Sequence, residues 1–535
     1  MPASGSSTGS IEALRDALSD PSAYPHEPDR VELVQTHISL VALVPPWVYK
    51  VKKPLDLGFL DFATLSDRHA ACKAEVRLNR RLCTDVYQDV VPILETDAGL
   101  HVDPPNASDA DAVEYAVKMR YLPPDGFLHH QLEQGTVTPE TVDRVARTLA
   151  TFYEARTSTP EIAEEGWVAR LRVSTDENFE QTKALVGDAL PRPTYDALRR
   201  YTNRFFEQHA ALFHQRRAHG FFLEGHGDLR LEHVHLTDEA VCIYDCIEFN
   251  ERFRYLDVAN DVAFLAMDFD VHGRPDLSRH LVRRMQEALD DPDLTTLLPF
   301  YKSYRAYVRG KVEGMKAAEA EVPAADRSAS RVKARRFYQW ALRYAVSGTD
   351  PLVVVVMGRA GTGKSTQASA LARCLGWTHI ASDRVRKTRA GVPLHIRPDA
   401  ETRTHLYSER MSAATYATLR TRAIERARQH ESTVLDATYS SRVERDRLRS
   451  ALRAEDVSYV FVELVADDDT LRDRLGRRNG EATVSDARAE DFDMLTERYE
   501  TPDALEDARH IRVSTTDAPE TTTTAILNAL TALRH

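Results

Sequence analysis

The sequence predicts a two-domain protein of mixed α/β and α+β class, in which the C-terminal domain is a doubly wound parallel sheet. First, 535 residues are too many for a single hydrophobic core. Second, residues 351–535 alternate short apolar runs with helical sequence, and "LVVVV" (352–356) is apolar at every position, as in a strand covered on both faces. Third, residues 30–122 have the pattern of strands with one helix, whereas residues 137–345 are mainly helical.

A boundary between the two domains is expected near residue 347. A basic helical stretch ends there at Ser347-Gly348, before Pro351, and strand–helix alternation begins. The start of the chain, "MPASGSSTGS", is rich in Ser and Gly. We therefore expect a loose segment over residues 1–29, one domain over 30–345 and a second domain over 350–535.

The expected elements follow in order. In the first domain we expect strands over 37–44, 47–53 and 114–122, a charged helix near 66–85, helices over 137–215, strands near 221–224 and 240–249, and helices again to about 345. In the second domain we expect strands over 352–358, 378–382, 432–438, 457–466 and 510–515, each followed by a helix.

Composition limits the classes of function. A hydrophobic fraction of 42% with 28% charged residues is ordinary for a soluble globular protein, and a net charge of −12 argues against nucleic acid or an anionic membrane as the main partner. No signal peptide and no membrane-spanning run is evident, and nothing in the sequence indicates an obligate protein partner. The five cysteines (Cys72, Cys83, Cys242, Cys246 and Cys374) show no zinc-binding spacing, and we expect reduced thiols in a cytoplasmic protein.

The most specific motif is "GRAGTGKS" at 358–365, which fits G-x-x-x-x-G-K-[ST] and lies between a buried strand and a helix. Its glycines allow backbone amides to point at a phosphate chain, Lys364 is expected to reach the terminal phosphates, and the Ser365 hydroxyl is expected to ligate Mg²⁺. The motif therefore predicts binding of ATP with Mg²⁺. The residues expected to bind the nucleotide are Gly358, Arg359, Ala360, Gly361, Thr362, Gly363, Lys364, Ser365 and Thr366.

Three further features follow strands of the same domain. Asp383 can accept a proton from an acceptor hydroxyl, or it is a helix N-cap followed by solvated arginines. Asp436, at the end of the third strand, can reach the Mg²⁺ shell, or it is also a cap. The arginines after the fourth strand (Arg474, Arg477 and Arg478) form either a lid over phosphates or a solvated face.

With these motifs, residues 351–535 resemble the small P-loop kinases of the gluconate-kinase, adenylylsulfate-kinase and zeta-toxin-like group, which is grouped with AAA-family ATPases. The resemblance implies transfer of a phosphoryl group from ATP to a small hydroxyl acceptor. It implies that Asp383 engages the acceptor and that Arg474 and Arg478 stabilise the transferring charge.

The first domain contains a second set of candidate residues. In "GHGDLRLEHVHL" (225–236) a tight turn presents Asp228, and the strand "VCIYDCIEF" carries Asp245. Two carboxylates at neighbouring strand ends can serve an acceptor hydroxyl and a metal ion. Upstream, Lys50 and Lys52 point to one face of a strand, and Glu75 lies on a helix that can pair with a strand lysine.

With these residues in this order, residues 30 to about 340 resemble the aminoglycoside phosphotransferase branch of the protein-kinase-like fold, which is bilobal. The two-domain order resembles the bacterial fusion of such a domain with a P-loop kinase domain. The resemblance implies that Asp228 is the catalytic base, Asp245 the metal ligand, and Lys50 with Glu75 the pair that positions phosphates. Either Asp257 or Asp261 would brace the catalytic loop.

Two features depart from that family. No glycine-rich loop precedes Lys50, and His233 stands where the family has a metal-binding Asn. A neutral imidazole can still ligate a cation, although it is a softer partner for Mg²⁺ than an amide oxygen. Alternatively, His226, Asp228, His233 and His235 gather a transition metal, or His233 and His235 are structural.

Three functions follow. The first is an ATP-dependent phosphotransferase with two kinase-like modules and a small hydroxyl acceptor. Its P-loop module is the active site with the more specific motif. The second is a nucleotide-operated regulatory protein with a pseudokinase-like first domain. The third is antibiotic modification, for which the acidic runs 103–114 and 161–166 would supply a pocket, although surface acidity explains them as well.

Overall fold

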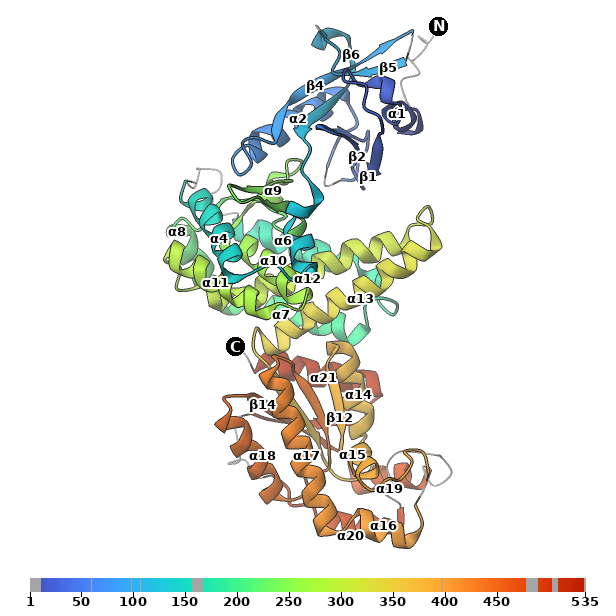
Figure 1. Cartoon of the computed structure of the whole chain (residues 1–535). Helices are drawn as coiled ribbons and strands as arrows, with labels where there is room; N and C mark the ends of the chain where they lie inside the picture. The colour runs from blue at the N-terminus through green and yellow to red at the C-terminus, as the bar shows by residue number, and fades with distance from the viewer. Residues whose placement is uncertain are drawn as a thin grey trace. The chain divides into compact units, whose positions relative to one another are not determined.

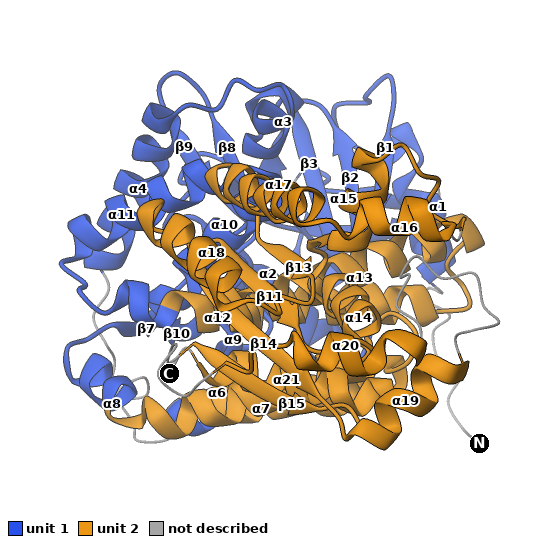
Figure 2. Cartoon of the chain, turned by 90° about the horizontal axis from the view of Figure 1, so that it is seen from below, with its two compact units in different colours: residues 1–170, 212–297 blue, residues 171–211, 298–535 orange. Residues whose placement is uncertain are grey.

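The computed structural model of the chain describes all residues except 1–10, 59, 98, 106, 156–166, 397, 478–488, 503–508 and 534–535. Figure 1 shows the chain from its N-terminus to its C-terminus. The chain divides into two compact units, residues 1–170 with 212–297 and residues 171–211 with 298–535 (Figure 2). Within the described residues, no helix has both the length and the apolar character needed to cross a membrane.

The first unit begins with a six-stranded antiparallel sheet in the order β1-β2-β3-β6-β4-β5. One face packs against Leu18, Ala23 and Tyr24, and the other packs against the helix α2 (Leu65–Asn79). The strands are β1 (Glu32–Gln35), β2 (Ser39–Val44), β3 (Trp47–Lys52), β4 (Tyr87–Thr96), β5 (Gly99–Val102) and β6 (Ala112–Arg120).

The expectation of a loose segment over residues 1–29 is wrong for its described part. Residues 11–18 form the helix α1 (Ile11–Leu18), and the Tyr24 hydroxyl donates a hydrogen bond to the Leu18 carbonyl at 2.6 Å. The Ser/Gly-rich composition ends at Ser10, and beyond it Leu14 and Leu18 give α1 an apolar face that the sheet buries.

The rest of the first unit is mainly helical and carries two small antiparallel ribbons. β7 (Phe222–Glu224) pairs with β10 (Tyr255–Asp257), and β8 (Val234–Leu236) pairs with β9 (Val241–Ile243). Asp228 lies between β7 and β8, and Asp245 follows β9. The helices are α3 (Leu128–Glu133), α4 (Pro139–Glu154), α8 (Ala210–Ala218), α9 (Glu251–Arg254), α10 (Val258–Val271) and α11 (Pro275–Leu289).

The second unit contains a five-stranded parallel sheet in the order β12-β13-β11-β14-β15. This is a doubly wound sheet, as the sequence predicts, because helices cover both of its faces: α14 and α21 on one, α17 and α18 on the other. The strands are β11 (Leu352–Met357), β12 (Thr378–Ala381), β13 (Thr433–Asp436), β14 (Ser458–Val465) and β15 (His510–Ser514).

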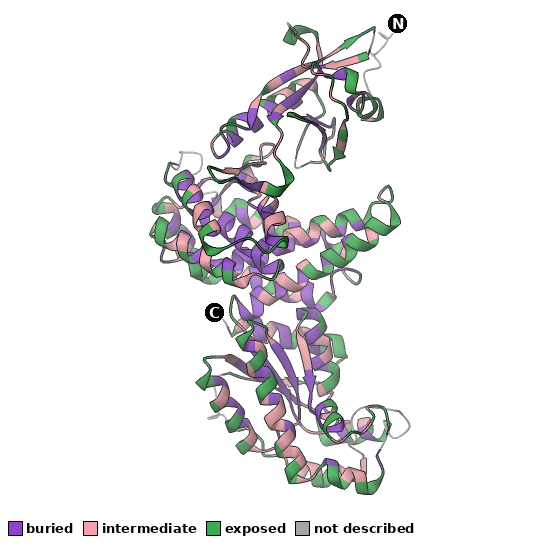
Figure 3. Ribbon diagram, viewed as in Figure 1, coloured by how far each residue is buried: buried purple, intermediate pink, exposed green. Residues whose placement is uncertain are grey.

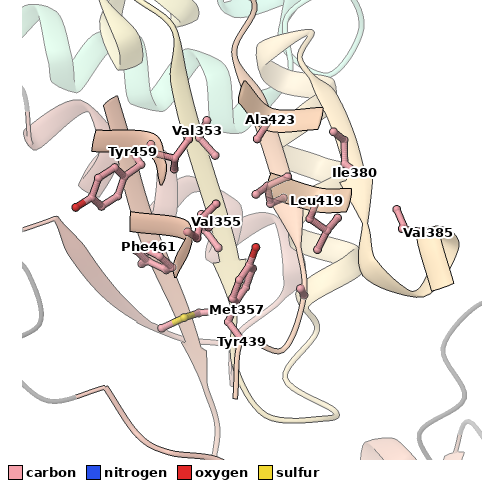
Figure 4. Close-up of a cluster of buried hydrophobic side chains, with 14 residues drawn as sticks. Val353, Val355, Met357, Ile380, Val385, Leu419, Ala423, Tyr439, Tyr459 and Phe461 are labelled. Atoms are coloured by element: carbon pink, nitrogen blue, oxygen red, sulfur yellow. The ribbon is translucent and has the colours of Figure 1, made fainter. Parts of the chain in front are cut away.

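The core of this sheet explains its run of valines. Val353, Val355 and Met357 point toward α17 and α18 and pack with Tyr459 and Phe461 (Figure 4), whereas Val354 and Val356 point to the opposite face. In the strand "LVVVVM" every residue after Leu352 is buried, and the central strands of the sheet are mostly buried (Figure 3).

Helices complete the second unit. Those of the sheet domain are α14 (Lys364–Leu375), α15 (Ser382–Arg389), α16 (Ala400–Leu406), α17 (Glu409–Arg428), α18 (Arg442–Ala454), α19 (Asp468–Arg477), α20 (Phe492–Glu497) and α21 (Pro519–Ala532). Those that precede it in the chain are α6 (Trp167–Gln181), α7 (Arg192–Gln208), α12 (Leu294–Ala318) and α13 (Ala324–Ser347).

The division into units differs from the boundary expected at 345–350. Residues 171–211 and 298–347 belong to the same compact unit as the P-loop. Helix α13 ends against α14: the Arg343 guanidinium donates to the carbonyls of Leu375 and Gly376 at 2.6 Å each, and Gln339 donates to the Arg373 carbonyl at 2.9 Å. These side chains satisfy the free carbonyls at the end of α14 and complement its dipole, which joins the two segments.

The expectation of five free thiols is also wrong. Cys83, after α2, and Cys242, in β9, form a disulfide across 159 residues of sequence, with their Cα atoms 4.6 Å apart. The described free cysteines, Cys72, Cys246 and Cys374, are all buried. Sequence spacing cannot reveal this pairing because it depends on how the sheet and the ribbon β8–β9 fold together.

Candidate functional site

The P-loop of the second unit connects β11 to α14. Gly358 has a φ of 140°, and a Cβ added there would lie 2.4 Å from the Leu464 carbonyl oxygen, so this position requires glycine. Inside the loop, the Thr362 hydroxyl and the Lys364 ammonium donate to the Arg359 carbonyl at 2.9 and 2.8 Å. These two hydrogen bonds make the loop a compact turn, and they place the Lys364 ammonium at the Arg359 carbonyl.

The backbone of this loop is suited to an anion. Helix α14 begins at Lys364, its N-cap Gly363 has a φ of 83°, and no side chain caps the helix. The first amides of a helix have no intrahelical acceptor and carry partial positive charge. These amides and Lys364 provide the donors that a phosphate chain requires.

Asp436 lies beside the P-loop. It pairs in register with Val356 of β11, and the amide of Ala437 donates to the Val356 carbonyl at 3.3 Å. The Asp436 side chain is buried, and its carboxylate lies 3.5 Å from His379 Nε2. Asp436 is not a helix cap, because the next helix, α18, has Ser441 as its N-cap. Asp436 supplies a carboxylate at the sheet edge from which the P-loop starts, and the loop itself carries the Ser365 hydroxyl; both are oxygen ligands of the kind that Mg²⁺ prefers.

Asp383 lies in the first turn of α15, at the same edge of the sheet. The N-cap of α15 is Ala381, so Asp383 does not cap the helix. Its carboxylate accepts a hydrogen bond from the Arg386 guanidinium at 3.1 Å, and Arg386 in turn lies 4.5 Å from the centre of the Tyr407 ring. Arg386 is buried, whereas Arg384 is exposed. Asp383, Arg386 and Tyr407 thus form a polar group after β12.

The arginines of α19 have different positions. Arg474 donates to the hydroxyl of Thr515 at 3.0 Å and to the Thr515 carbonyl, which joins α19 to the end of β15. Arg477 is exposed and pairs with Asp473 at 2.9 Å. Arg478 lies outside the described residues.

Sequence reasoning missed Glu463, a buried carboxylate in β14 that pairs in register with Met357 just before the P-loop. The Tyr499 hydroxyl donates to it at 3.0 Å, and His510 Nε2 lies 3.4 Å away. Burial opposes the charge of Glu463, but the neighbouring His510 imidazole and the hydrogen bond from Tyr499 outweigh it and lower the pKa of this carboxyl. A charged residue within an otherwise apolar strand, "YVFVELV", was the available signal.

The first unit has a separate cluster of charged side chains. Lys50 Nζ lies 2.8 Å from Glu75 Oε1 and 2.6 Å from Asp245 Oδ1. Lys50 and Lys52 share the face of β3 that α2 covers, and Lys52 also pairs with Glu75 and with Glu248. Glu75 and Lys52 are fully buried. The structure thus confirms the predicted pairing of Glu75 with a strand lysine and brings Asp245 to the same lysine; sequence reasoning missed Glu248, three residues after Asp245.

The electrostatics of this cluster favour charged side chains. Burial opposes the charge on Lys50, but Asp245, Glu75 and Glu248 together hold the pKa of Lys50 well above its usual value. Burial likewise opposes the charge on Asp245 and Glu75, and the neighbouring lysines, foremost Lys50, lower the pKa of both carboxyls. In contrast, burial dominates at Glu248 and raises its pKa. Asp245 also has a φ of 63°, a left-handed conformation that is uncommon for a residue other than glycine.

Two histidines order the loop that carries Asp228. His226 Nε2 lies 2.9 Å from the Tyr244 carbonyl, and its Nδ1 receives a hydrogen bond from the amide of Asp228 at 3.3 Å. A carbonyl only accepts and an amide only donates, so the ring is neutral with its proton on Nε2; burial also lowers the pKa of His226. His233 Nδ1 lies 2.8 Å from the Asp228 carbonyl, which leaves Nε2 facing Asp245 Oδ2 at 3.5 Å.

The structure distinguishes the two aspartates that follow. Asp261 is buried and accepts hydrogen bonds from the amides of His226 at 2.7 Å and Gly227 at 3.0 Å, and from the Tyr153 hydroxyl at 3.1 Å. Asp257 instead pairs with Arg216 at 2.7 Å. Asp261 is therefore the residue that braces the loop.

The structure also bears on the missing glycine-rich loop and on the possible transition-metal site. The turn between β1 and β2, residues 36–38, contains no glycine, as the sequence indicated. His235 turns away from Asp228, and its Nε2 lies 3.0 Å from the Pro123 carbonyl. Among the described residues, no group of three or more His, Cys, Asp or Glu side chains is arranged to hold a metal ion, so the four residues proposed for a transition metal are not gathered.

Comparisons with known proteins agree with the P-loop assignment. Residues 353–502 match the family described as AAA domain, which agrees with the P-loop and the parallel sheet of this part of the chain. An uncharacterized protein of Mycobacterium bovis and one of Mycobacterium tuberculosis are each 29% identical to this chain over 475 residues, which covers 86% of this chain and 88% of each relative.

Three solved structures are similar to part of the chain. They are a gluconokinase from Sinorhizobium meliloti 1021 (23% identity, TM-score 0.26, covering 34% of this chain and 92% of that one), Chaetomium thermophilum Kti12 in complex with ADP-AlF3 (18%, 0.26, 33% and 98%) and shikimate kinase from Aquifex aeolicus vf5 (15%, 0.24, 33% and 95%). We assign the fold of the second unit from its own strand order and P-loop geometry.

Proposed function

We propose that this chain is an ATP-dependent phosphotransferase in which the P-loop module binds ATP with Mg²⁺ and transfers the γ-phosphoryl group to a small hydroxyl acceptor. The observation that carries the proposal is the loop at 358–365, which ends in an uncapped helix N-terminus beside the buried carboxylate of Asp436. When bound, Mg²⁺ would neutralise charge on the phosphates and would be held by the Ser365 hydroxyl and Asp436.

In this module each residue has a separate task. The amides of the loop and Lys364 orient the phosphate chain, because they are fixed donors aimed at one region. Asp383 accepts the proton of the acceptor hydroxyl, and Arg386 holds the Asp383 carboxylate in position at 3.1 Å. Arg474 positions α19 through Thr515, and Arg478 remains a proposed phosphate contact.

We propose that the first unit is a second, aminoglycoside phosphotransferase-like module of the protein-kinase-like fold. The pairing of Lys50 with Glu75 and Asp245, and the loop held by Asp261, support this proposal. In this module Asp228 is the base and Lys50 orients phosphates, and Asp245 and His233 would hold the metal ion when it is bound. His233 Nε2 is the atom that faces Asp245, and the proton on its Nδ1 is directed to the Asp228 carbonyl.

A second candidate function has support of its own. The β1–β2 turn lacks glycine, so it cannot wrap phosphates as a glycine-rich loop does, and His233 replaces the metal-binding Asn. Both features favour a regulatory protein, in which a pseudokinase-like first unit senses a ligand and the P-loop unit acts as the ATPase.

Release of ADP from Mg-ATP by the full chain tests both functions. We expect Lys364→Ala, placed in an Asp228→Asn background so that the first unit does not contribute, to lower ADP release at least about a hundredfold, because the P-loop loses its phosphate-binding cation. If Asp228→Asn leaves the rate unchanged, the first unit does not turn over ATP and the regulatory function is favoured. If Lys364→Ala retains the rate of the Asp228→Asn background, the proposed function is wrong. If the P-loop module is active, a screen of small hydroxylated compounds for ATP-dependent gain of one phosphoryl group would identify the acceptor.

A further inference from the structure

The second unit contains a cavity along α14, the helix that follows the P-loop. It has a volume of about 680 Å³ and lies between α14 and the starts of α7 and α21, with α13 forming one wall. This volume is within the range of small-molecule sites. Its α14 wall consists of Thr366, Ala370, Arg373 and Cys374, which share one face of that helix, so the cavity lies along the helix that begins at the P-loop.

Positive charge gathers around this cavity. Arg192, Arg335 and Arg373 line it, against the two carboxylates of Asp188 and Glu520. Asp188 pairs with Arg331 at 2.9 Å, and Arg335 donates only to the neutral carbonyl of Asp188 at 3.2 Å. Arg192 pairs with Asp196 at 2.9 Å, so the excess positive charge at the cavity comes from Arg335 and Arg373, and within the described residues Arg335 forms no ion pair with a carboxylate.

Two helices start at the cavity without a side-chain cap. Helix α7, of 17 residues, has Pro191 as its N-cap, and helix α21, of 14 residues, has Ala518; neither N-cap makes a side-chain hydrogen bond. Pro191, Arg192, Pro519 and Glu520 all line the cavity. Pro191, Pro193 and Pro519 have no N–H, but the other amides in the first turns lack an intrahelical acceptor, and each helix N-terminus has a partial positive charge that adds to the charge of the arginines.

A buried hydroxyl also lacks a partner here. Tyr338 is one of the residues that line the cavity; it is fully buried, and its hydroxyl has no hydrogen-bond partner among the described residues. An unpaired buried hydroxyl costs free energy, which a ligand that supplies an acceptor or a donor would recover. The remaining surface includes Pro191, Pro193 and Ala370, which offer apolar contact to the body of a ligand.

We propose that this cavity is a regulatory binding site for a phosphorylated polyhydroxy compound, such as a sugar phosphate. Arg335, Arg373 and the two helix N-termini would hold the phosphate, whereas Asp188, Glu520 and the Tyr338 hydroxyl would bond to the hydroxyl groups. Compounds of this class are what a kinase of small hydroxyl acceptors produces, so this part of the inference rests on the proposed function.

The structure provides a connection from the cavity to the P-loop. The Gln367 side chain of α14 donates to the Pro519 carbonyl at 3.0 Å and accepts from the Thr523 hydroxyl at 2.7 Å, so the first turns of α14 and α21 are bonded to each other. The other end of α14 is held by Gln339 and Arg343 of α13. A ligand that contacts α7, α13 and α21 together therefore acts on the helix whose first residues, Lys364 and Ser365, belong to the P-loop.

Calorimetry with glucose 6-phosphate as the probe tests the site on the full-length Lys364→Ala variant, in which phosphate binding at the P-loop is weakened. Into this background we place Arg335→Gln with Arg373→Gln, and separately Ala370→Met, which fills the cavity. We expect the two arginine substitutions to weaken binding about tenfold or more and Ala370→Met to abolish it. Arg200→Gln, an exposed arginine of α7 that does not line the cavity, is the matched control and should bind as the background does.

Two outcomes overturn the binding site: no binding of the probe at millimolar concentration, or equal binding by all variants. Glucose alone and inorganic phosphate alone should bind more weakly than the probe, because each offers half of the recognised groups. The regulatory part is tested on the wild-type chain, where the probe should change the Kd for Mg-ATP at least about fivefold. An unchanged Kd refutes regulation, whereas failure of Mg-ATP to bind at all refutes the proposed function and leaves the probe binding as a separate result.

Discussion

Single residues decide whether the P-loop can form. Gly358→Ala places a Cβ 2.4 Å from the Leu464 carbonyl oxygen at a φ of 140°, so either the loop or β14 must move. We expect this variant to lose about 1–3 kcal/mol of unfolding free energy and to lose binding of ATP. Denaturant unfolding and ATP titration measure the two effects.

The matched control is Gly391→Ala. Gly391 also has a positive φ, 67°, but no atom of the described residues lies within 4 Å of the added Cβ, so only the backbone cost of about 1 kcal/mol should remain and ATP should still bind. Equal effects of the two substitutions would show that the close approach to Leu464 is unimportant.

His226 gives the first unit a predictable response to pH. Burial lowers its pKa, so the folded protein holds the ring neutral at pH values where an unfolded chain begins to take up a proton. The stability that depends on neutral His226 is present above the usual histidine pKa of about 6.5 and is lost as the pH falls from there toward the lowered value. Unfolding measured from pH 8 to pH 5 should show this loss.

His226→Gln is the variant for comparison, since its side-chain amide is neutral at every pH in that range. The variant should be less stable at pH 8, because it does not reproduce both ring hydrogen bonds, and its stability should change less between pH 6.5 and pH 5. An identical pH dependence in both proteins would contradict the role given to His226.

Among the elements, three segments of the first unit depend on one buried ion cluster. Arg216 of α8 pairs with Asp257, before α10, at 2.7 Å and with Asp291, after α11, at 2.6 Å, and all three side chains are fully buried. Because a buried charge that loses its partner is not rehydrated, we expect Asp291→Asn to cost about 3–5 kcal/mol. Thermal or denaturant unfolding of the full chain checks this value.

The neighbouring substitution Asp290→Asn makes the same chemical change at an exposed position. Asp290 has a φ of 48°, which asparagine tolerates, so its unfolding free energy should change by less than about 0.5 kcal/mol. If both variants unfold alike, the buried cluster does not hold these helices together.

The elements also show where sequence patterns suffice. Period-two alternation predicts that Lys50 and Lys52 share a face of β3, and the run "LVVVV" predicts a strand buried on both sides; both predictions are confirmed. Glu248 was not predicted, because its partner Lys52 is distant in sequence and nothing in "IEF" indicates which way the side chain points. The same holds for the disulfide between Cys83 and Cys242.

For the whole molecule, the sequence predicts two folded parts and the residue ranges of the parallel strands. It does not predict which helices belong to which part. Residues 171–211 and 298–347 join the P-loop unit because contacts such as Arg343 with the end of α14 attach them there. Helical periodicity predicts that these helices form, but it does not indicate the surface against which they pack. The cavity beside α14 arises from that same arrangement.

Binding of Mg-ATP to the full chain, measured by calorimetry on the wild type and on Lys364→Ala, tests the central claim most directly. Lys50→Met serves as the control, since it removes the corresponding lysine of the first unit. We expect the wild type and Lys50→Met to bind at the P-loop and Lys364→Ala to lose this binding. Absence of binding by the wild type for every purine triphosphate, or undiminished binding by Lys364→Ala, would contradict the claim.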